Sequence, residues 1–147
     1  MITVTKRNGA REALDIKKTQ KYTCESVENL KNVSQSELEL DAQLQFRDGM
    51  MTEEIQSTLI QTAVDKIDVD CPDWTFVASR LFLYDLYHKV GRVLGTSRGK
   101  RYPHLRTYME YNEKNGRIYS GLMDKFDLDE LNEYLVESRD FQFNYLG

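Results

Sequence analysis

The strongest constraint on the fold comes from residues 74–90, a predicted helix with apolar side chains on almost every face. These apolar residues include Trp74, Val77, Ala78, Leu81, Phe82, Leu83, Tyr84, Leu86, Tyr87 and Val90. A helix that is apolar nearly all round is normally buried, so other elements must cover it. The sequence therefore predicts helices packed around this central one.

A second helix is predicted to precede the central one. Thr52 is suited to the N-cap, with Glu53 and Glu54 in the first turn, where acidic groups complement the helix dipole. Its apolar residues recur every four positions: Ile55, Leu59, Ala63 and Ile67. This pattern predicts an amphipathic helix to about residue 69. Cys71-Pro72-Asp73 then interrupts it, and Asp73 can cap the central helix.

The N-terminus is predicted to form a hairpin at Asn8-Gly9, a dipeptide that favours a type I′ turn. This turn puts the basic pair Lys6-Arg7 on one strand and Glu12 on the other. Asp15 can then cap a helix over about residues 17–30. One interpretation is a solvated charged surface; the other is that hairpin and helix start form a lid over a phosphate-bearing ligand.

Residues 34–46 carry conflicting signals. Ser34 and Glu37 fit a capping box, which predicts a helix. The apolar residues nevertheless alternate strictly with polar ones, as in a strand: Leu38, Leu40, Ala42, Leu44 and Phe46. A turn at Asp48-Gly49 and a short strand at Met50-Met51 are predicted to follow.

The C-terminal third is predicted to be a separate helical segment. Three glycines in residues 91–100 indicate a linker, which places a domain boundary near residues 92–100. Residues 104–115 and 127–138 show helical patterns, and 141–143 could form a terminal strand. The domains expected are therefore residues 1–91 and 92–147.

Composition limits the classes of function. The net charge of −4 argues against broad nucleic-acid binding, although residues 1–22 hold six Lys and Arg against two acids, which suits an anionic ligand. Cys24 and Cys71 form no metal-binding spacing and are interpreted as buried free thiols of a reducing compartment. We find no catalytic constellation. Without a signal region or an 18-residue apolar run, the expected location is the cytoplasm.

Four motifs occur in a distinctive order. They are Val4-Thr5-Lys6-Arg7-Asn8-Gly9 with Glu12, Asp15 and Lys18; Phe46-Arg47-Asp48-Gly49-Met50-Met51-Thr52; Pro72-Asp73-Trp74; and Ala78-Ser79-Arg80-Leu81. Over residues 2–91 this set resembles the ATP-cone, the nucleotide-sensing domain of ribonucleotide reductases. Residues 102–147 resemble the helical lead-in that follows the cone in the large (alpha) subunit of class I ribonucleoside-diphosphate reductases.

The resemblance implies an α+β, mostly helical fold, in which a small three-stranded sheet caps a four-helix bundle and a helical lead-in follows. It also implies that residues 38–46 are helical. The positions that match the family's nucleotide site are Lys6, Arg7, Glu12, Asp15, Lys18, Thr52, Ile55, His88 and Lys89. Among these, Lys6 and Arg7 match positions at the phosphates, as does one of His88 and Lys89. Gln56 matches a position at which some members of the family carry a histidine.

The function implied by the resemblance is allosteric control of deoxyribonucleotide synthesis for DNA replication. ATP or dATP, together with Mg²⁺, would be the effector. The partners would be a radical-bearing small (beta) subunit and another large subunit, with no membrane and no nucleic acid. The resemblance also implies that this chain holds none of the reductase's catalytic cysteines. The alternatives are a basic-hairpin module that binds nucleic acid or regulates transcription, and a cone that has become purely structural.

Overall fold

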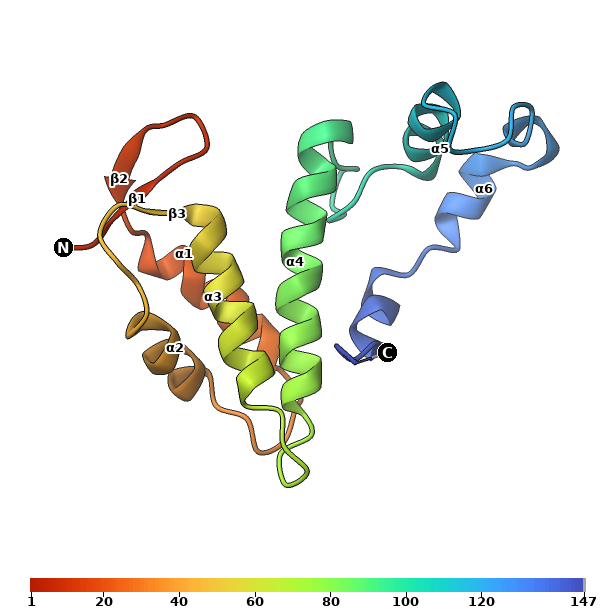
Figure 1. Ribbon diagram of the computed structural model, residues 1–147. Coiled ribbons are helices and arrows are strands. Elements are labelled where there is room, and N and C mark those ends of the chain that lie inside the picture. Colours follow the sequence, from red (N-terminus) through yellow and green to blue (C-terminus); the bar gives the residue numbers. More distant parts are fainter. Residues whose placement is uncertain (147) are drawn as a thin grey trace. The chain divides into compact units, whose positions relative to one another are not determined.

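The sheet that begins the fold has three short strands (Figure 1). In the computed structural model, which describes residues 1–146, these are β1 (Thr3–Thr5), β2 (Arg11–Ala13) and β3 (Met50–Met51). Their order is β2-β1-β3, with β1 antiparallel to β2 and parallel to β3. Val4 on the central strand is only 2% exposed, because its side chain joins the core beneath the sheet.

The hairpin is present, but its turn differs from the predicted type I′. Gly9 has a φ of 82°, whereas Asn8 does not adopt a positive φ. The N–H of Gly9 donates to the Lys6 carbonyl, and that of Lys6 donates to the Ala10 carbonyl, both at 2.8 Å. This is the pattern of a three-residue loop, which needs only one left-handed residue, supplied by glycine. The Asn8 side chain instead accepts a hydrogen bond from Ala10 N–H.

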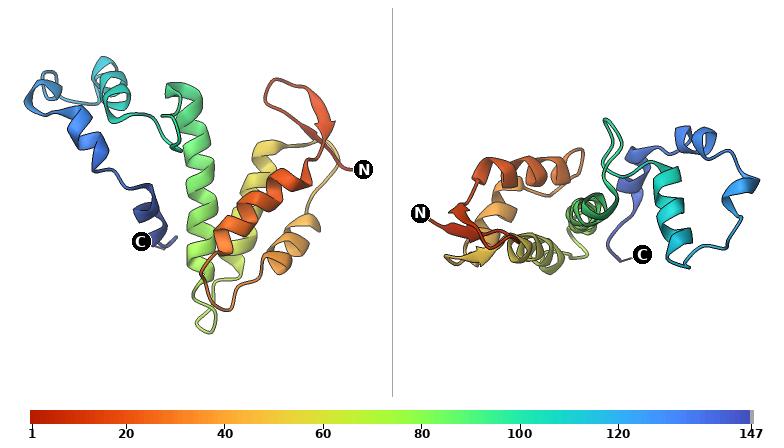
Figure 2. Two further views of the ribbon diagram at one scale, coloured as in Figure 1. Left: turned by 180° about the vertical axis from the view of Figure 1, so that it is seen from behind. Right: turned by 90° about the horizontal axis from the view of Figure 1, so that it is seen from above.

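Four helices accompany the sheet: α1 (Ile16–Val27), α2 (Gln35–Gln43), α3 (Thr52–Asp65) and α4 (Trp74–Leu94). Asp15 caps α1 as predicted, accepting from the Lys18 N–H. Figure 2 shows that α1 and α3 both begin at the sheet. The α+β, mostly helical fold class is confirmed.

Residues 35–43 are helical, as the capping box and the resemblance predict, although the helix ends at Gln43 and not at Phe46. The strand-like alternation is misleading. Ser34 caps α2 through the N–H of Glu37. Leu38 and Ala42 are fully buried, whereas Leu40 and Leu44 are 63% and 85% exposed. Each pair is four residues apart, so the strict alternation arises from two apolar stripes on different sides of one helix.

The core of the first unit is built on α2, α3 and the first half of α4. Its buried apolar residues are Val4, Leu38, Ala42, Ile55, Leu59, Ala63, Trp74, Val77, Ala78 and Leu81. The prediction that residues 74–90 are buried all round is only partly correct, since Phe82 is 46% exposed. The helix also continues to Leu94, beyond its predicted end. It stops where Gly95 adopts a φ of 76° and its N–H donates to the Gly91 carbonyl.

The chain divides into two compact units, one comprising Met1–Tyr84 with the residues from Phe141 on, the other Asp85–Asp140. The second contains the end of α4, α5 (Leu105–Lys114), the 3₁₀ turn η1 (Met123–Lys125) and α6 (Leu128–Glu133). Arg106 on α5 pairs with Asp129 on α6 at 3.1 Å. Because α6 ends at Glu133, the helix predicted over residues 127–138 is shorter than expected.

The predicted strand at 141–143 is wrong, because the 3₁₀ helix η2 runs over Glu137–Gln142. The cysteine prediction also needs correction. Cys24 is exposed and Cys71 is half-buried, so the free thiols are not both in the core.

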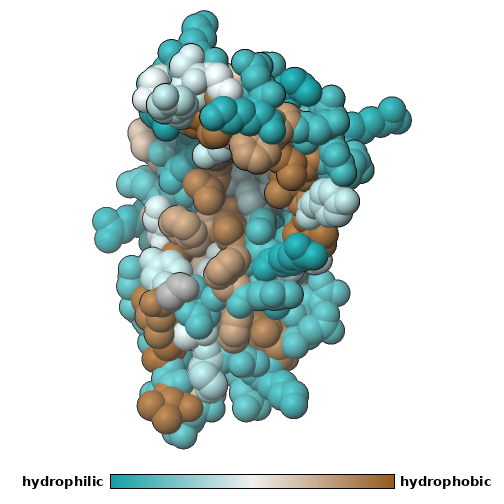
Figure 3. All heavy atoms as spheres, turned by 90° about the vertical axis from the view of Figure 1, so that its right-hand side faces the viewer, coloured by the Kyte–Doolittle hydropathy of each residue, from teal (hydrophilic) through white to brown (hydrophobic). Residues whose placement is uncertain are grey.

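No helix within residues 1–146 is long and apolar enough to span a membrane. Figure 3 shows one face of the molecule, on which apolar side chains lie among hydrophilic ones.

The core can be tested by truncating Leu59, which is 2% exposed. We expect Leu59→Ala to lower the free energy of unfolding by about 3 kcal/mol, because it removes buried methyl groups and leaves a cavity. Urea unfolding followed by circular dichroism measures this change. Val69→Ala, at a 93% exposed position, is the control and should stay within about 0.5 kcal/mol of wild type. Equal losses in both variants would contradict this core.

Candidate functional site

Two basic residues of the hairpin are held by acidic residues. The Lys6 Nζ lies 2.7 Å from a carboxylate oxygen of Glu12, and both side chains are 46% exposed. The register pairs Val4 with Glu12, so Lys6 and Glu12 are diagonal neighbours across the hairpin. The structure thus brings together two of the predicted site residues.

Arg7, at the tip of the hairpin, forms an ion pair with Glu53 in the first turn of α3. The two side chains are 41% and 46% exposed. This contact joins the hairpin to the start of the helix that carries Thr52 and Ile55. The sequence predicts only a helix-dipole interaction for Glu53, because no local pattern reveals a partner 46 residues earlier in the chain.

The start of α3 differs by one residue from the prediction. Met51, not Thr52, is the N-cap, and Glu54 accepts a hydrogen bond from the Met51 N–H at 2.7 Å. Thr52 is therefore the first helical residue and is exposed. Ile55 is only 6% exposed and belongs to the core, so it lies under the helix start and not on the surface.

The start of α1 contributes Asp15 and Lys18. The carboxylate of Asp15 accepts from the Lys18 N–H at 3.3 Å, and both side chains are exposed. This cap fixes the beginning of α1 directly after β2. The positive ends of two helix dipoles, those of α1 and α3, therefore occur at the sheet that carries Lys6 and Arg7 (Figure 1).

Asp48 ties the sheet to the loop before α3. Its carboxylate accepts from the hydroxyl of Thr3 at 2.7 Å and from the Thr3 N–H at 2.8 Å. The Thr5 hydroxyl donates to the carbonyl of Gly49 at 2.8 Å. Hydrogen bonding from the Thr3 side chain and backbone, with a smaller contribution from Arg11, lowers the pKa of Asp48 despite some desolvation. These contacts hold β1 beside β3.

Gln56 connects α3 to α4. Its side-chain amide donates to the carbonyl of Leu81 at 2.9 Å. Gln56 lies one turn after Thr52, so this bond fixes the early part of α3 against the buried helix.

His88 and Lys89 lie on α4 within the second unit. Lys89 pairs with Asp85 one turn earlier on the same helix. Their predicted part in a site with Lys6 and Arg7 is not tested by these contacts. It stays a prediction.

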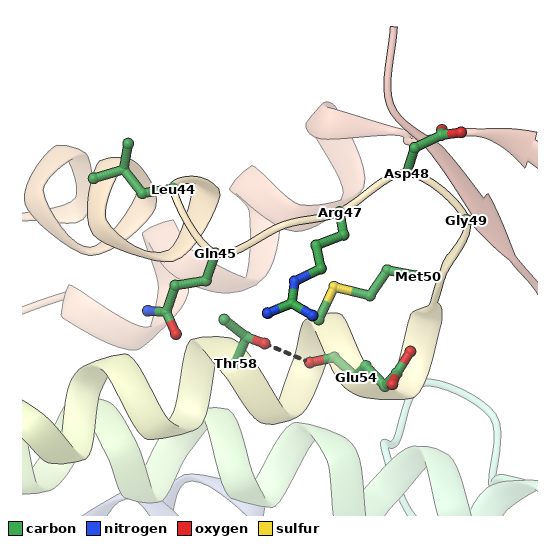
Figure 4. A pocket seen from close by; sticks show the side chains of 8 residues that line it. All are labelled: Leu44, Gln45, Arg47, Asp48, Gly49, Met50, Glu54 and Thr58. Atoms are coloured by element: carbon green, nitrogen blue, oxygen red, sulfur yellow. Dashed lines mark hydrogen bonds between the residues drawn. The ribbon is translucent and has the colours of Figure 1, made fainter.

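A pocket of about 650 Å³ lies between α3 and the loop that connects α2 to β3 (Figure 4). Its lining residues come from the segment that follows α2, from β3 and from α3: Leu44, Gln45, Arg47, Asp48, Gly49, Met50, Glu54 and Thr58. Arg47 extends into it, and the Thr58 hydroxyl bonds to the Glu54 carbonyl. None of the predicted nucleotide-site residues lines this pocket. Across residues 1–146, no group of three or more His, Cys, Asp or Glu side chains could hold a metal ion.

Comparison with known proteins defines the class. The ATP cone domain family matches residues 2–89, more than half of the chain, and the chain belongs to this family. The residues that carry the hairpin ion pairs and the start of α3 all lie within the matched part.

The relatives are reductase subunits. The chain is 63% identical, over its whole length, to the ribonucleoside-diphosphate reductase subunit alpha of Helicobacter pylori. It is 30% and 29% identical, over 98% of its length, to ribonucleoside-diphosphate reductase 1 subunit alpha of Salmonella typhimurium and of Escherichia coli. It spans 18% of the length of each of these three relatives.

The Asp48 contacts predict a pH-dependent stability. A lowered carboxyl pKa in the folded state stabilises the fold above the ordinary carboxyl pKa, and this contribution is lost as pH falls through the lowered value. We expect Asp48→Asn to unfold more easily in urea than wild type at pH 6, with the difference shrinking at pH 3. Asp124→Asn, an exposed position in η1, controls for the loss of one negative charge. A constant difference between wild type and Asp48→Asn at both pH values would contradict this role.

Proposed function

We propose that this chain is the allosteric ATP- and dATP-binding regulatory domain of a ribonucleoside-diphosphate reductase large subunit. Family membership supports a nucleotide-binding regulatory domain, and the relatives supply the enzyme class. The observation that carries the proposal is the arrangement of Lys6 and Arg7 on a hairpin beside the beginnings of α1 and α3.

The chemistry of this arrangement suits a triphosphate. Lys6 offers a point charge, while the planar Arg7 guanidinium can bind two phosphate oxygens at once. Helix N-termini bind phosphates through free backbone N–H groups and the dipole. The present partners of both cations are exposed carboxylates, and exposed ion pairs contribute little free energy. A polyphosphate can therefore replace them at low cost.

The remaining predicted residues have proposed roles around this centre. Asp15 and Lys18 border the site at the start of α1, and Thr52 provides an exposed hydroxyl at the start of α3. Ile55 forms an apolar floor from below. His88 or Lys89 binds the phosphates from α4. Mg²⁺ would arrive bound to the phosphates, with Glu12 as its protein ligand once the phosphates replace Glu12 at Lys6.

The proposal for the full-length protein follows from the relatives. Its reaction would be the reduction of ribonucleoside diphosphates for DNA synthesis, in the cytoplasm, with a radical-bearing small subunit and another large subunit as partners. ATP would favour the active assembly and dATP an inhibited one. Such switching needs only a difference in affinity between two states, typically about 1–3 kcal/mol. Residues 92–147 would be the linker and helical lead-in.

Isothermal titration of the chain with ATP and dATP, each with Mg²⁺, tests the proposal. Saturable binding of both is expected. In Lys6→Ala/Lys18→Ala, affinity should fall by about tenfold or more, because charge-assisted bonds to phosphate are lost. Lys100→Ala/Lys114→Ala, which removes two exposed lysines of the second unit, should bind as wild type does. Absence of binding at millimolar nucleotide, together with a salt-sensitive mobility shift of short DNA, would favour the nucleic-acid alternative.

A further inference from the structure

Glu53 is not one of the residues proposed to bind the nucleotide, yet its side chain contacts one of them, Arg7. It lies in the first turn of α3 and forms an ion pair with Arg7. A second acidic residue, Glu54, already satisfies the Met51 N–H at the helix start. The inner face of the same turn is held by Ile55, which is buried in the core. The fold therefore has other means of fixing this end of α3.

The ion pair itself adds little to stability. Both side chains are more than a third exposed, and pairs of this kind are screened by water and salt. The pair does, however, occupy the guanidinium of Arg7 and so limits its availability to other anions. The planar fork of an arginine can bind one carboxylate or two phosphate oxygens, so an anion that binds Arg7 must compete with Glu53.

We infer that Glu53 is an affinity-determining residue, an internal anion that competes with the effector's phosphates for Arg7 and so weakens nucleotide binding. This inference rests on the proposed function, because it requires the phosphates to bind at the hairpin. Glu53 acts in two ways. It must be displaced from Arg7, and its negative charge then remains near the phosphates and repels them.

Competition between Glu53 and the phosphates predicts which nucleotide affinities Glu53 weakens most. Repulsion grows with the charge of the ligand, so the effect of Glu53 is larger for triphosphates than for diphosphates. Glu53 acts on the phosphate end through Arg7, which does not involve the sugar. The ratio of ATP to dATP affinity is therefore independent of Glu53. A residue that merely orients Arg7, or that ligates Mg²⁺, has the opposite effect on affinity when it is removed.

The experiment is titration of Glu53→Gln with ATP, dATP and ADP, each with Mg²⁺, beside the wild-type chain. We expect affinity for ATP and dATP to increase by about threefold to tenfold, equally for both, given the modest strength of exposed pairs. The increase for ADP should be smaller. The urea midpoint should remain that of wild type, which shows that the change acts on binding.

Two further variants locate the effect. Glu54→Gln removes a negative charge one residue later in the chain, from a side chain that accepts a hydrogen bond from the Met51 N–H and does not pair with Arg7. This variant should raise nucleotide affinity less than Glu53→Gln does. In an Arg7→Gln background, Glu53→Gln should give a reduced gain, since only the repulsion remains to be relieved.

The outcomes separate this inference from the proposed function. If wild type binds ATP and dATP but Glu53→Gln binds them equally or more weakly, the competition is refuted and the proposed function stands. An equal gain from Glu54→Gln also refutes it, because general charge then explains the effect. If neither wild type nor Glu53→Gln binds either nucleotide, both the inference and the proposed function are overturned.

Discussion

The fold depends on burial of one side of the first half of α4. Trp74, Val77, Ala78 and Leu81 are at most 2% exposed and belong to one buried cluster with apolar residues of α2, α3 and β1. Burying side chains of this size provides most of the free energy that offsets the loss of chain entropy. Because this core fixes α3, it also fixes Glu53 and Thr52 at the helix start. The exposed charges of the candidate site are thus placed by apolar contacts beneath them.

The site contrasts with the core in the strength of its contacts. The pairs Lys6–Glu12 and Arg7–Glu53 are exposed, and such pairs exchange partners at little cost. Asp48, in turn, fixes the sheet through two hydrogen bonds to Thr3. A rigid support with exchangeable surface ion pairs is the arrangement expected of a domain that senses an anionic effector. Exchange of these exposed pairs for an anionic ligand would not require the core to unfold or repack.

Several features could be predicted from residues alone. The Asn8-Gly9 hairpin, the Asp15 cap and the existence of a helix near Thr52 follow from local chemistry, and the structure confirms these elements, with the helix beginning one residue earlier than predicted. Other predictions failed because local patterns are degenerate. The alternation over residues 38–46 taken alone favours a strand, but it also fits a helix with two apolar stripes, which is the form that the Ser34 cap begins. The type of hairpin turn likewise depended on the length of the loop, which the dipeptide does not specify.

The sequence by itself determined the order of the motifs, the family and the surplus of positive charge in the first 22 residues, because these depend only on which residues occur and in what order. The tertiary structure alone decided which charges meet. Arg7 and Glu53 are 46 positions apart, and their contact follows from β1 pairing with β3, which places the start of α3 beside the hairpin. Pairing between distant segments arises from global packing and leaves no local signal in the chain.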